Sequence, residues 1–197
     1  MSGGGAGPAG GLGGIATGGS DAAGAGAGGT AAAPELSVLY ADRSSEAPEP
    51  STESKSIRPV FVIENQSAEP VLLSELRLRY YYRLEAAKPE VFECEFVHPD
   101  EIVNDCDGVL GSFGTVSGAE ASHYFELGFA PPAEVWSLPA FGGQSGRILV
   151  RVFKEGFARQ DQTNDYSYDP TKLEPLSAWD RVTLYRNDEL VFGVEPE

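Results

Sequence analysis

Short stretches of apolar residues, or of alternating apolar and polar residues, recur along the chain from position 36 onward. They are rich in Val, Leu, Tyr and Phe, and each ends at Gly, Pro, Asn or Asp, which is the pattern of β-strands separated by turns. The predicted strands are LSVLYAD, IRPVFVIEN, VLLSELRLRYYYRLE with a bend between two halves, VFECEF, LGSFGTV, SHYFELGF, GRILVRVF, DRVTLYR and ELVFGV.

The order of these strands also predicts the fold class. Asn187 and Asp188 separate the last two strands, as expected for the turn of a hairpin. No segment shows a convincing helical period, so helices are not expected between the strands. The pattern therefore predicts an all-β fold, an antiparallel two-sheet β-sandwich.

The stretch LRLRYYYRLE has two different faces, because side chains alternate along a strand. One face carries Leu76, Leu78, Tyr80 and Tyr82, and the other carries Arg77, Arg79, Tyr81 and Arg83. An outward stripe of Arg and Tyr can stack on flat ligands. A solvated strand face without a ligand is the alternative.

The first 33 residues have a different composition from the rest. They contain 14 Gly and 10 Ala, with Asp21 as the only charged residue, and cannot bury a core. We expect a disordered Gly/Ala-rich linker over residues 1–33, followed by one domain over residues 34–197.

The net charge of −16 excludes several classes of partner. Nucleic acids and anionic membrane surfaces would repel the chain, and no cluster of Lys or Arg offsets this repulsion. No apolar run approaches the roughly 18 residues of a membrane-spanning helix. Neither nucleic acid binding nor membrane insertion is expected.

The sequence lacks the signatures of common catalytic sites. It contains two histidines, His98 and His123, and no G-x-S-x-G, H-E-x-x-H, P-loop or Rossmann motif. Carboxylates are numerous, but pairs of acids are unavoidable at this composition. We expect no catalytic residues.

Cys94 and Cys106 are the two cysteines of the chain, and a disulfide could close the loop between them. Such a bond would indicate an oxidising compartment. Two unpaired thiols in a cytosolic protein are the alternative.

Several stretches agree, in order and spacing, with one family: LSVLY, IRPVFVIEN, LSELRLRYYY, VFECEF, YFELGF, QTNDYSYDP and AWDRVTLYRNDELVFG. Over about residues 34–192 the chain resembles the family 3 carbohydrate-binding modules, the cellulose-binding domains of bacterial cellulases and scaffolding proteins. The resemblance implies a nine-stranded jelly-roll sandwich with a structural calcium ion, a flat face that lies on cellulose, and a shallow groove on the opposite sheet.

The resemblance also implies a set of calcium ligands. In this sequence they correspond to Arg83, Glu85, Asp161, Asn164 and Asp165. The stretch QTNDYSYDP offers the carboxylate, amide and backbone oxygens that calcium prefers, whereas Arg83 can contribute only its backbone carbonyl. The alternative is an Asn/Asp turn whose side chains cap their own backbone.

The flat face differs from the family pattern. The family pairs an Asp at the end of the strand FWCD with an aromatic or His that follows it. This chain has FECE followed by Phe, so Glu95 and Phe96 take these positions. The family's Arg corresponds to Arg151 and its Trp to Phe157. Phe in place of Trp removes about 50 Å² of stacking area, on the order of 1 kcal/mol, so weaker binding is expected. In the alternative, Phe157 is buried and Glu95 is a solvated acid.

The groove on the other sheet would use Arg79, Tyr81 and Tyr166, as contacts for a single glycan chain or a peptide linker. Packing between strands is the alternative for these residues.

Together, these features predict non-catalytic binding of cellulose or a related β-glucan by a monomer outside the cell or at its surface, in a system that includes glycoside hydrolases. The sequence itself shows no signal peptide. The alternative is a protein-interaction or sensor module that keeps the jelly roll with little or no cellulose binding.

Overall fold

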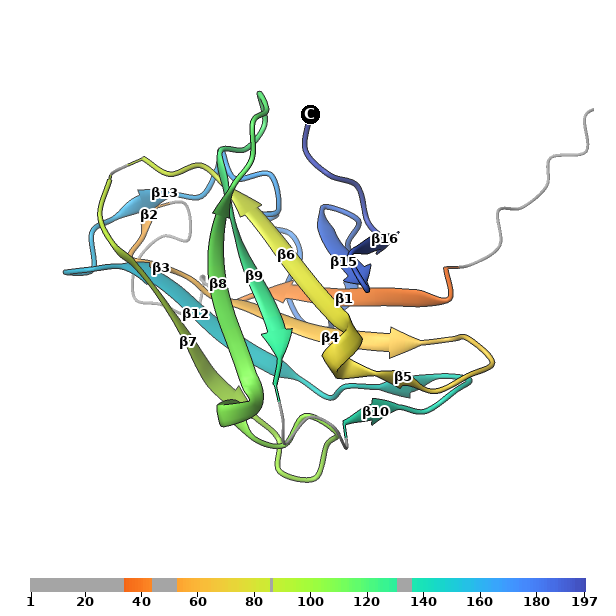
Figure 1. Cartoon of the computed structure of the whole chain (residues 1–197). Helices are drawn as coiled ribbons and strands as arrows, with labels where there is room; N and C mark the ends of the chain where they lie inside the picture. Colours follow the sequence, from red (N-terminus) through yellow and green to blue (C-terminus); the bar gives the residue numbers. More distant parts are fainter. Residues whose placement is uncertain (1–33, 44–52, 86, 131–135) are drawn as a thin grey trace, which may run out of the picture. The chain divides into compact units, whose positions relative to one another are not determined.

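Two antiparallel sheets form the fold in the computed structural model, which describes residues 34–43, 53–85, 87–130 and 136–197 (Figure 1). The described residues belong to one unit, Ala33–Glu197. The predicted linker over residues 1–33 lies outside the described ranges.

The larger sheet, which we call the β1 sheet, has seven strands. Its order is β14-β1-β4-β12-β3, with β11 paired to β4 and β7 paired to β12. The bounds of its strands are β1 (Leu36–Asp42), β3 (Ser56–Ile57), β4 (Pro59–Asn65), β7 (Glu90–Val97), β11 (Gly143–Gln144), β12 (Ile148–Lys154) and β14 (Ser177–Ala178).

The second sheet, which we call the β6 sheet, has five strands in the order β16-β15-β6-β9-β8. Its strands are β6 (Leu76–Tyr82), β8 (Val109–Thr115), β9 (His123–Phe129), β15 (Val182–Arg186) and β16 (Glu189–Phe192). Figure 1 shows β6, β8 and β9 crossing in front of β1, β4 and β12, so the two sheets form two layers.

The remaining elements are short. Two small pairs join β2 (Glu53–Ser54) to β13 (Gln160–Asp161), and β5 (Val71–Leu72) to β10 (Ser137–Leu138). Two 3₁₀ turns, η2 (Leu73–Glu75) and η3 (Cys106–Gly108), precede β6 and β8. No helix in the described part of the chain is long and apolar enough to cross a membrane.

The core lies between the two sheets and is built from alternate residues of their strands. In β6 the predicted inward residues, Leu76, Leu78, Tyr80 and Tyr82, are all buried in this core. Tyr80 stacks on Phe125 of β9, with ring centroids 5.1 Å apart. The period of two read from the sequence is therefore confirmed in β6.

Each predicted strand overlaps an observed one, and the predicted bend divides VLLSELRLRYYYRLE at η2. The predicted strand IRPVFVIEN is interrupted at Arg58, between β3 and β4. In the described residues, nine strands have four or more residues, in agreement with the nine-stranded sandwich that the family resemblance implies. Asn187 and Asp188 form the predicted hairpin turn, and both have positive φ, 51° and 68°. Positive φ at both central positions is typical of the tight turn that matches the twist of two paired strands.

Candidate functional site

A β-bulge in β7 directs two consecutive side chains to the same side of the β1 sheet. Cys94 pairs with Val150 and Phe96 pairs with Leu149, so Glu95 is an extra residue between two paired positions. Regular alternation would place Glu95 and Phe96 on opposite faces, whereas a bulge can re-aim a side chain. Val150 belongs to the core between the sheets, and Cys94 packs against it. We call the opposite surface of the β1 sheet, directed away from the β6 sheet, the outer face.

Four charged side chains form a connected group on the outer face. Arg58 donates to both carboxylate oxygens of Glu95, at 2.9 to 3.2 Å. Arg151 lies 3.4 Å from Glu95 and also donates to Glu93 on the neighbouring strand. The hydrogen bond to Glu93 raises the pKa of Arg151 above its ordinary value. Glu95 is therefore an ion-paired group rather than a solvated acid.

Two aromatic rings stack at the C-terminal end of β12. Phe157 lies on Phe153 with centroids 4.6 Å apart and an interplanar angle of 9°, and the guanidinium of Arg151 lies 5.1 Å from the centre of the Phe153 ring. Phe157 is 48% exposed, and so is Phe96. The alternative in which Phe157 is buried is therefore wrong.

The structure thus brings the four predicted face residues, Glu95, Phe96, Arg151 and Phe157, to one surface. Sequence reasoning missed Arg58 and Phe153. The position of Phe153 could have been predicted, because it is two residues after Arg151 on the same strand and must share its face. The role of Arg58 could not have been predicted, because its partner Glu95 is 37 residues away in the sequence.

The five predicted calcium ligands also converge. The backbone N–H of Arg83 donates to Asp165 at 2.8 Å. Glu85 accepts hydrogen bonds from the backbone N–H of Asp161, at 2.9 Å, and from the side-chain amide of Asn164, at 3.3 Å. The carboxylate of Asp161 also caps its own turn, as the alternative reading of this loop expected.

Negative charge is concentrated at this cluster. Burial raises the pKa of Asp165, and the negative charges of Glu85 and Asp161 raise it further, while the N–H of Arg83 and the charge of Lys154 lower it. Lys154 is itself buried and supplies part of the counter-charge. Within the described ranges, however, no group of three or more His, Cys, Asp or Glu side chains is placed to hold a metal ion. A calcium ion would need backbone and amide oxygens as well.

The groove residues on the β6 sheet need a correction. Tyr81 was expected on an exposed surface, but it is completely buried, and its hydroxyl group lies 2.8 Å from that of Thr183. Tyr166 packs edge-on against Tyr81 and is also buried. Arg79 lies between the rings of Tyr124 and Tyr185, 4.5 and 4.4 Å from their centres, and binds Glu126.

The segment after β16 binds two tyrosines at this surface. The carbonyl of Val194 accepts a hydrogen bond from Tyr166, and the carboxylate of Glu195 accepts one from Tyr185. The carbonyl of Glu197 accepts from the N–H groups of Ala119 and Glu120 in the loop between β8 and β9. The chain's own residues 194–197 therefore contact the surface where a ligand was expected, and Tyr81 and Tyr166 serve in packing.

Cys94 and Cys106 form a disulfide, as one of the two sequence alternatives expected. Their Cα atoms are 5.6 Å apart, and the bond links β7 to η3. It therefore fixes the strand that carries Glu95 and Phe96 next to the start of β8.

Comparison with known proteins decides the family. The family model described as "Cellulose binding domain" matches residues 44–193, more than half of the chain. The chain belongs to this family. As a family 3 module it is 37% identical over 140 residues to Endoglucanase A of Paenibacillus lautus, an alignment that covers 71% of this chain and 19% of that protein.

Solved structures agree with this assignment. The module matches the carbohydrate-binding module CBM3b of the cellulosomal cellobiohydrolase 9A from Clostridium thermocellum with a TM-score of 0.69 and 33% identity, over 82% of this chain and 99% of that one. It also matches biomass sensing modules from Rsgi-like proteins of Clostridium thermocellum, with a TM-score of 0.71 and 26% identity, over 83% and 100% of the two chains. The predicted family and jelly-roll fold are confirmed.

The module corresponds to a small part of several longer relatives. It spans 19% of Endoglucanase A and 15% of Exoglucanase-2 of Thermoclostridium stercorarium. Further relatives in Acetivibrio thermocellus are named cellulosomal-scaffolding protein A and anti-sigma-I factor RsgI4.

Proposed function

We propose that this module binds a neutral β-glucan such as cellulose through its outer face, without catalysing a reaction. The observation that carries the proposal is the half-exposed ring of Phe157, stacked on Phe153. A ring supported from behind presents a rigid apolar surface, as the apolar face of a glucose unit requires. The names of the relatives, which include an endoglucanase and a scaffolding protein, support a role beside cellulose.

The charged group beside the rings supports the same function. Arg58, Glu95 and Arg151 hold one another in fixed positions, so they need little reorganisation when a ligand binds. Carboxylate and guanidinium groups can bind the hydroxyl groups at the edge of a sugar ring. We infer that the outer face combines stacking by Phe96 and Phe157 with hydrogen bonding by Glu95 and Arg151.

Removal of one ring tests this proposal. Phe157→Ala should remove roughly 60 Å² of apolar contact, about 1.5 kcal/mol, and weaken adsorption to microcrystalline cellulose roughly tenfold. The measurement is a depletion isotherm at several protein loads. Phe113→Ala, on β8 of the β6 sheet, is the matched control because Phe113 is also an exposed ring, at 37%. Equal adsorption of Phe157→Ala and the wild type would refute the role of the outer face.

A sensor or protein-interaction module is the second candidate function. It is favoured by the match to biomass sensing modules, which has a TM-score of 0.71. Phe157 in place of the family's Trp is also consistent with a repurposed surface. Absence of wild-type adsorption at every load would favour this candidate over cellulose binding.

We further propose a structural calcium ion, held by the carbonyl oxygen of Arg83, by Glu85 and Asp161, and by Asn164 and Asp165. The convergence of these residues supports it. The ion would offset part of the negative charge near this loop and stabilise its irregular backbone, with amide and backbone oxygens completing the ligand set.

The setting of the module is also a proposal. We infer a monomer outside the cell or at its surface, in a system with glycoside hydrolases. The cellulosomal and cellulase relatives and the Cys94–Cys106 disulfide support this setting.

A further inference from the structure

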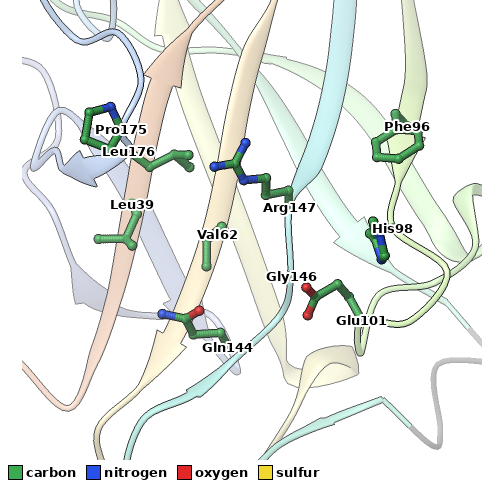
Figure 2. Close-up of a pocket in the computed structure, with 10 residues that line it drawn as sticks. All are labelled: Leu39, Val62, Phe96, His98, Glu101, Gln144, Gly146, Arg147, Pro175 and Leu176. Atoms are coloured by element: carbon green, nitrogen blue, oxygen red, sulfur yellow. The ribbon is translucent and has the colours of Figure 1, made fainter.

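The outer face is not flat throughout. Beside Phe96 it is hollowed by a depression of about 600 Å³ (Figure 2). Leu39 of β1 and Val62 of β4 are paired in register and line it from the sheet. Figure 2 shows Phe96 on one side of the depression and Leu176 on the other, with Arg147 between them.

An ion pair borders this depression and a second one. Arg147 donates to both oxygens of Glu174, at 3.0 and 3.2 Å. A neighbouring hollow of about 500 Å³ shares Phe96 and Arg147 with the first and includes Glu174 in its lining. We call the two hollows together the furrow. Phe96 lines both hollows, and β4 contributes Val60 and Val62 to their lining.

The chemistry of the furrow suits an uncharged sugar chain. Leu39, Val62 and Leu176 offer apolar surface, and polar groups stand above and beside it. Two of the five N–H groups of Arg147 bind Glu174, so the guanidinium keeps donors for hydroxyl groups. The amide of Gln144 is oriented by its hydrogen bond to Glu64. The net charge of −16 disfavours an anionic polysaccharide.

The Arg147–Glu174 pair contributes little to the stability of the fold. Its side chains are 56% and 41% exposed, and exposed ion pairs of this kind add little to folding stability. Its energetic effect on folding is therefore too small to explain its position across a hydrophobic hollow. A bound glucan chain would meet two oriented charged groups here, which can form hydrogen bonds to its hydroxyl groups.

Shape decides which form of glucan can enter. A crystalline surface is flat and rigid, so it touches protruding side chains such as Phe96 and Phe157 and cannot reach Val62, which is 6% exposed within the furrow. A single chain in solution can follow the hollow. We propose that the furrow binds a single β-glucan chain, a second binding mode beside contact with crystalline cellulose. This inference rests on the proposed function and names a further substrate form for the same face.

Calorimetric titration with soluble cellohexaose tests the furrow. The wild type should bind this probe, and Arg147→Ala should weaken binding on the order of tenfold, as expected for the loss of charge-assisted hydrogen bonds. Glu174→Gln keeps the shape of the pair and should weaken binding less. The matched control is Arg186→Ala, because Arg186 of the β6 sheet forms an ion pair with Glu75 of η2, at 2.8 Å, away from the furrow. It should keep wild-type affinity for cellohexaose.

The outcomes separate this inference from the proposed function. If the wild type adsorbs to microcrystalline cellulose but does not bind cellohexaose, the furrow is refuted and the proposed function stands. If Arg147→Ala and Arg186→Ala bind cellohexaose equally well, the site lies elsewhere and the inference is also refuted. A wild type that binds neither probe contradicts both. Thermal unfolding of each variant, with midpoints near that of the wild type, verifies that affinities are compared between folded proteins.

Discussion

Two opposing local effects meet at Phe157. Its backbone φ is +52°, in the left-handed region, which costs a residue other than glycine roughly 1–2 kcal/mol. Its stacking on Phe153 returns about 0.5–1.5 kcal/mol. Because these contributions are of similar size, local stability gives no strong preference for Phe over Gly here. Strained residues cluster at functional sites, and the proposed contact with a glucan would account for a ring at this position.

A larger ring at this position should therefore strengthen binding. Phe157→Trp adds about 50 Å² of stacking surface, on the order of 1 kcal/mol, and should raise the affinity for microcrystalline cellulose about fivefold. Adsorption isotherms of the two proteins give this ratio. Phe113→Trp on the β6 sheet is the control. An affinity that stays the same or falls would show that Phe157 is not a platform for the ligand.

Individual residues also show which parts of the candidate site could be predicted from the sequence. The family motif placed Phe157 and Arg151 on one face, and the structure agrees. Tyr81 was misjudged because strand alternation distinguishes two faces of a sheet but does not show what covers them. Its cover includes Tyr166, which is 85 positions away in the sequence and is itself bound to the carbonyl of Val194. Arg147 was missed for a similar reason, since Glu174 lies 27 residues away.

At the scale of elements, β7 determines the geometry of the outer face. Its bulge turns both Glu95 and Phe96 outward, and its disulfide ties Cys94 to η3. Strand existence was predictable, because β7 and its neighbours are rich in β-branched and aromatic residues. The bulge was not, because an extra residue in one strand shows only when its partner strand and register are known.

Loss of the disulfide should destabilise this arrangement. The bond spans twelve residues, and a loop of that length corresponds to about 3 kcal/mol of stabilisation through restriction of the unfolded chain. The double variant Cys94→Ala/Cys106→Ala should therefore unfold at a lower urea concentration than the oxidised wild type. Reduced wild type serves as the control and should behave like the double variant. Identical midpoints for oxidised and reduced protein would mean that the bond is not formed or does not stabilise the fold.

For the whole molecule, charge is the dominant feature. With a net charge of −16, repulsion between like charges destabilises the folded state. The carboxylates Glu85, Asp161 and Asp165 concentrate negative charge near one loop. Buried Lys154 offsets part of this charge. A bound calcium ion would offset more, and its effect would appear in the stability of the whole domain.

Thermal unfolding with and without calcium tests this expectation. At a concentration a hundredfold above Kd, calcium would add about 2.7 kcal/mol. For a domain of this size, that corresponds to a rise in Tm of about 5–10 °C. Glu85→Gln should reduce the rise, whereas Glu189→Gln, in the distant β15–β16 hairpin, should not. A Tm that does not respond to millimolar calcium would contradict the metal site.

Adsorption of the wild-type protein to microcrystalline cellulose is the most direct test of the account. Depletion from solution should follow a saturable isotherm, and Phe157→Ala should require a markedly higher protein concentration for the same coverage. Retention no greater than that of a protein without a carbohydrate site, at every load and with calcium present, would contradict binding of cellulose by the outer face.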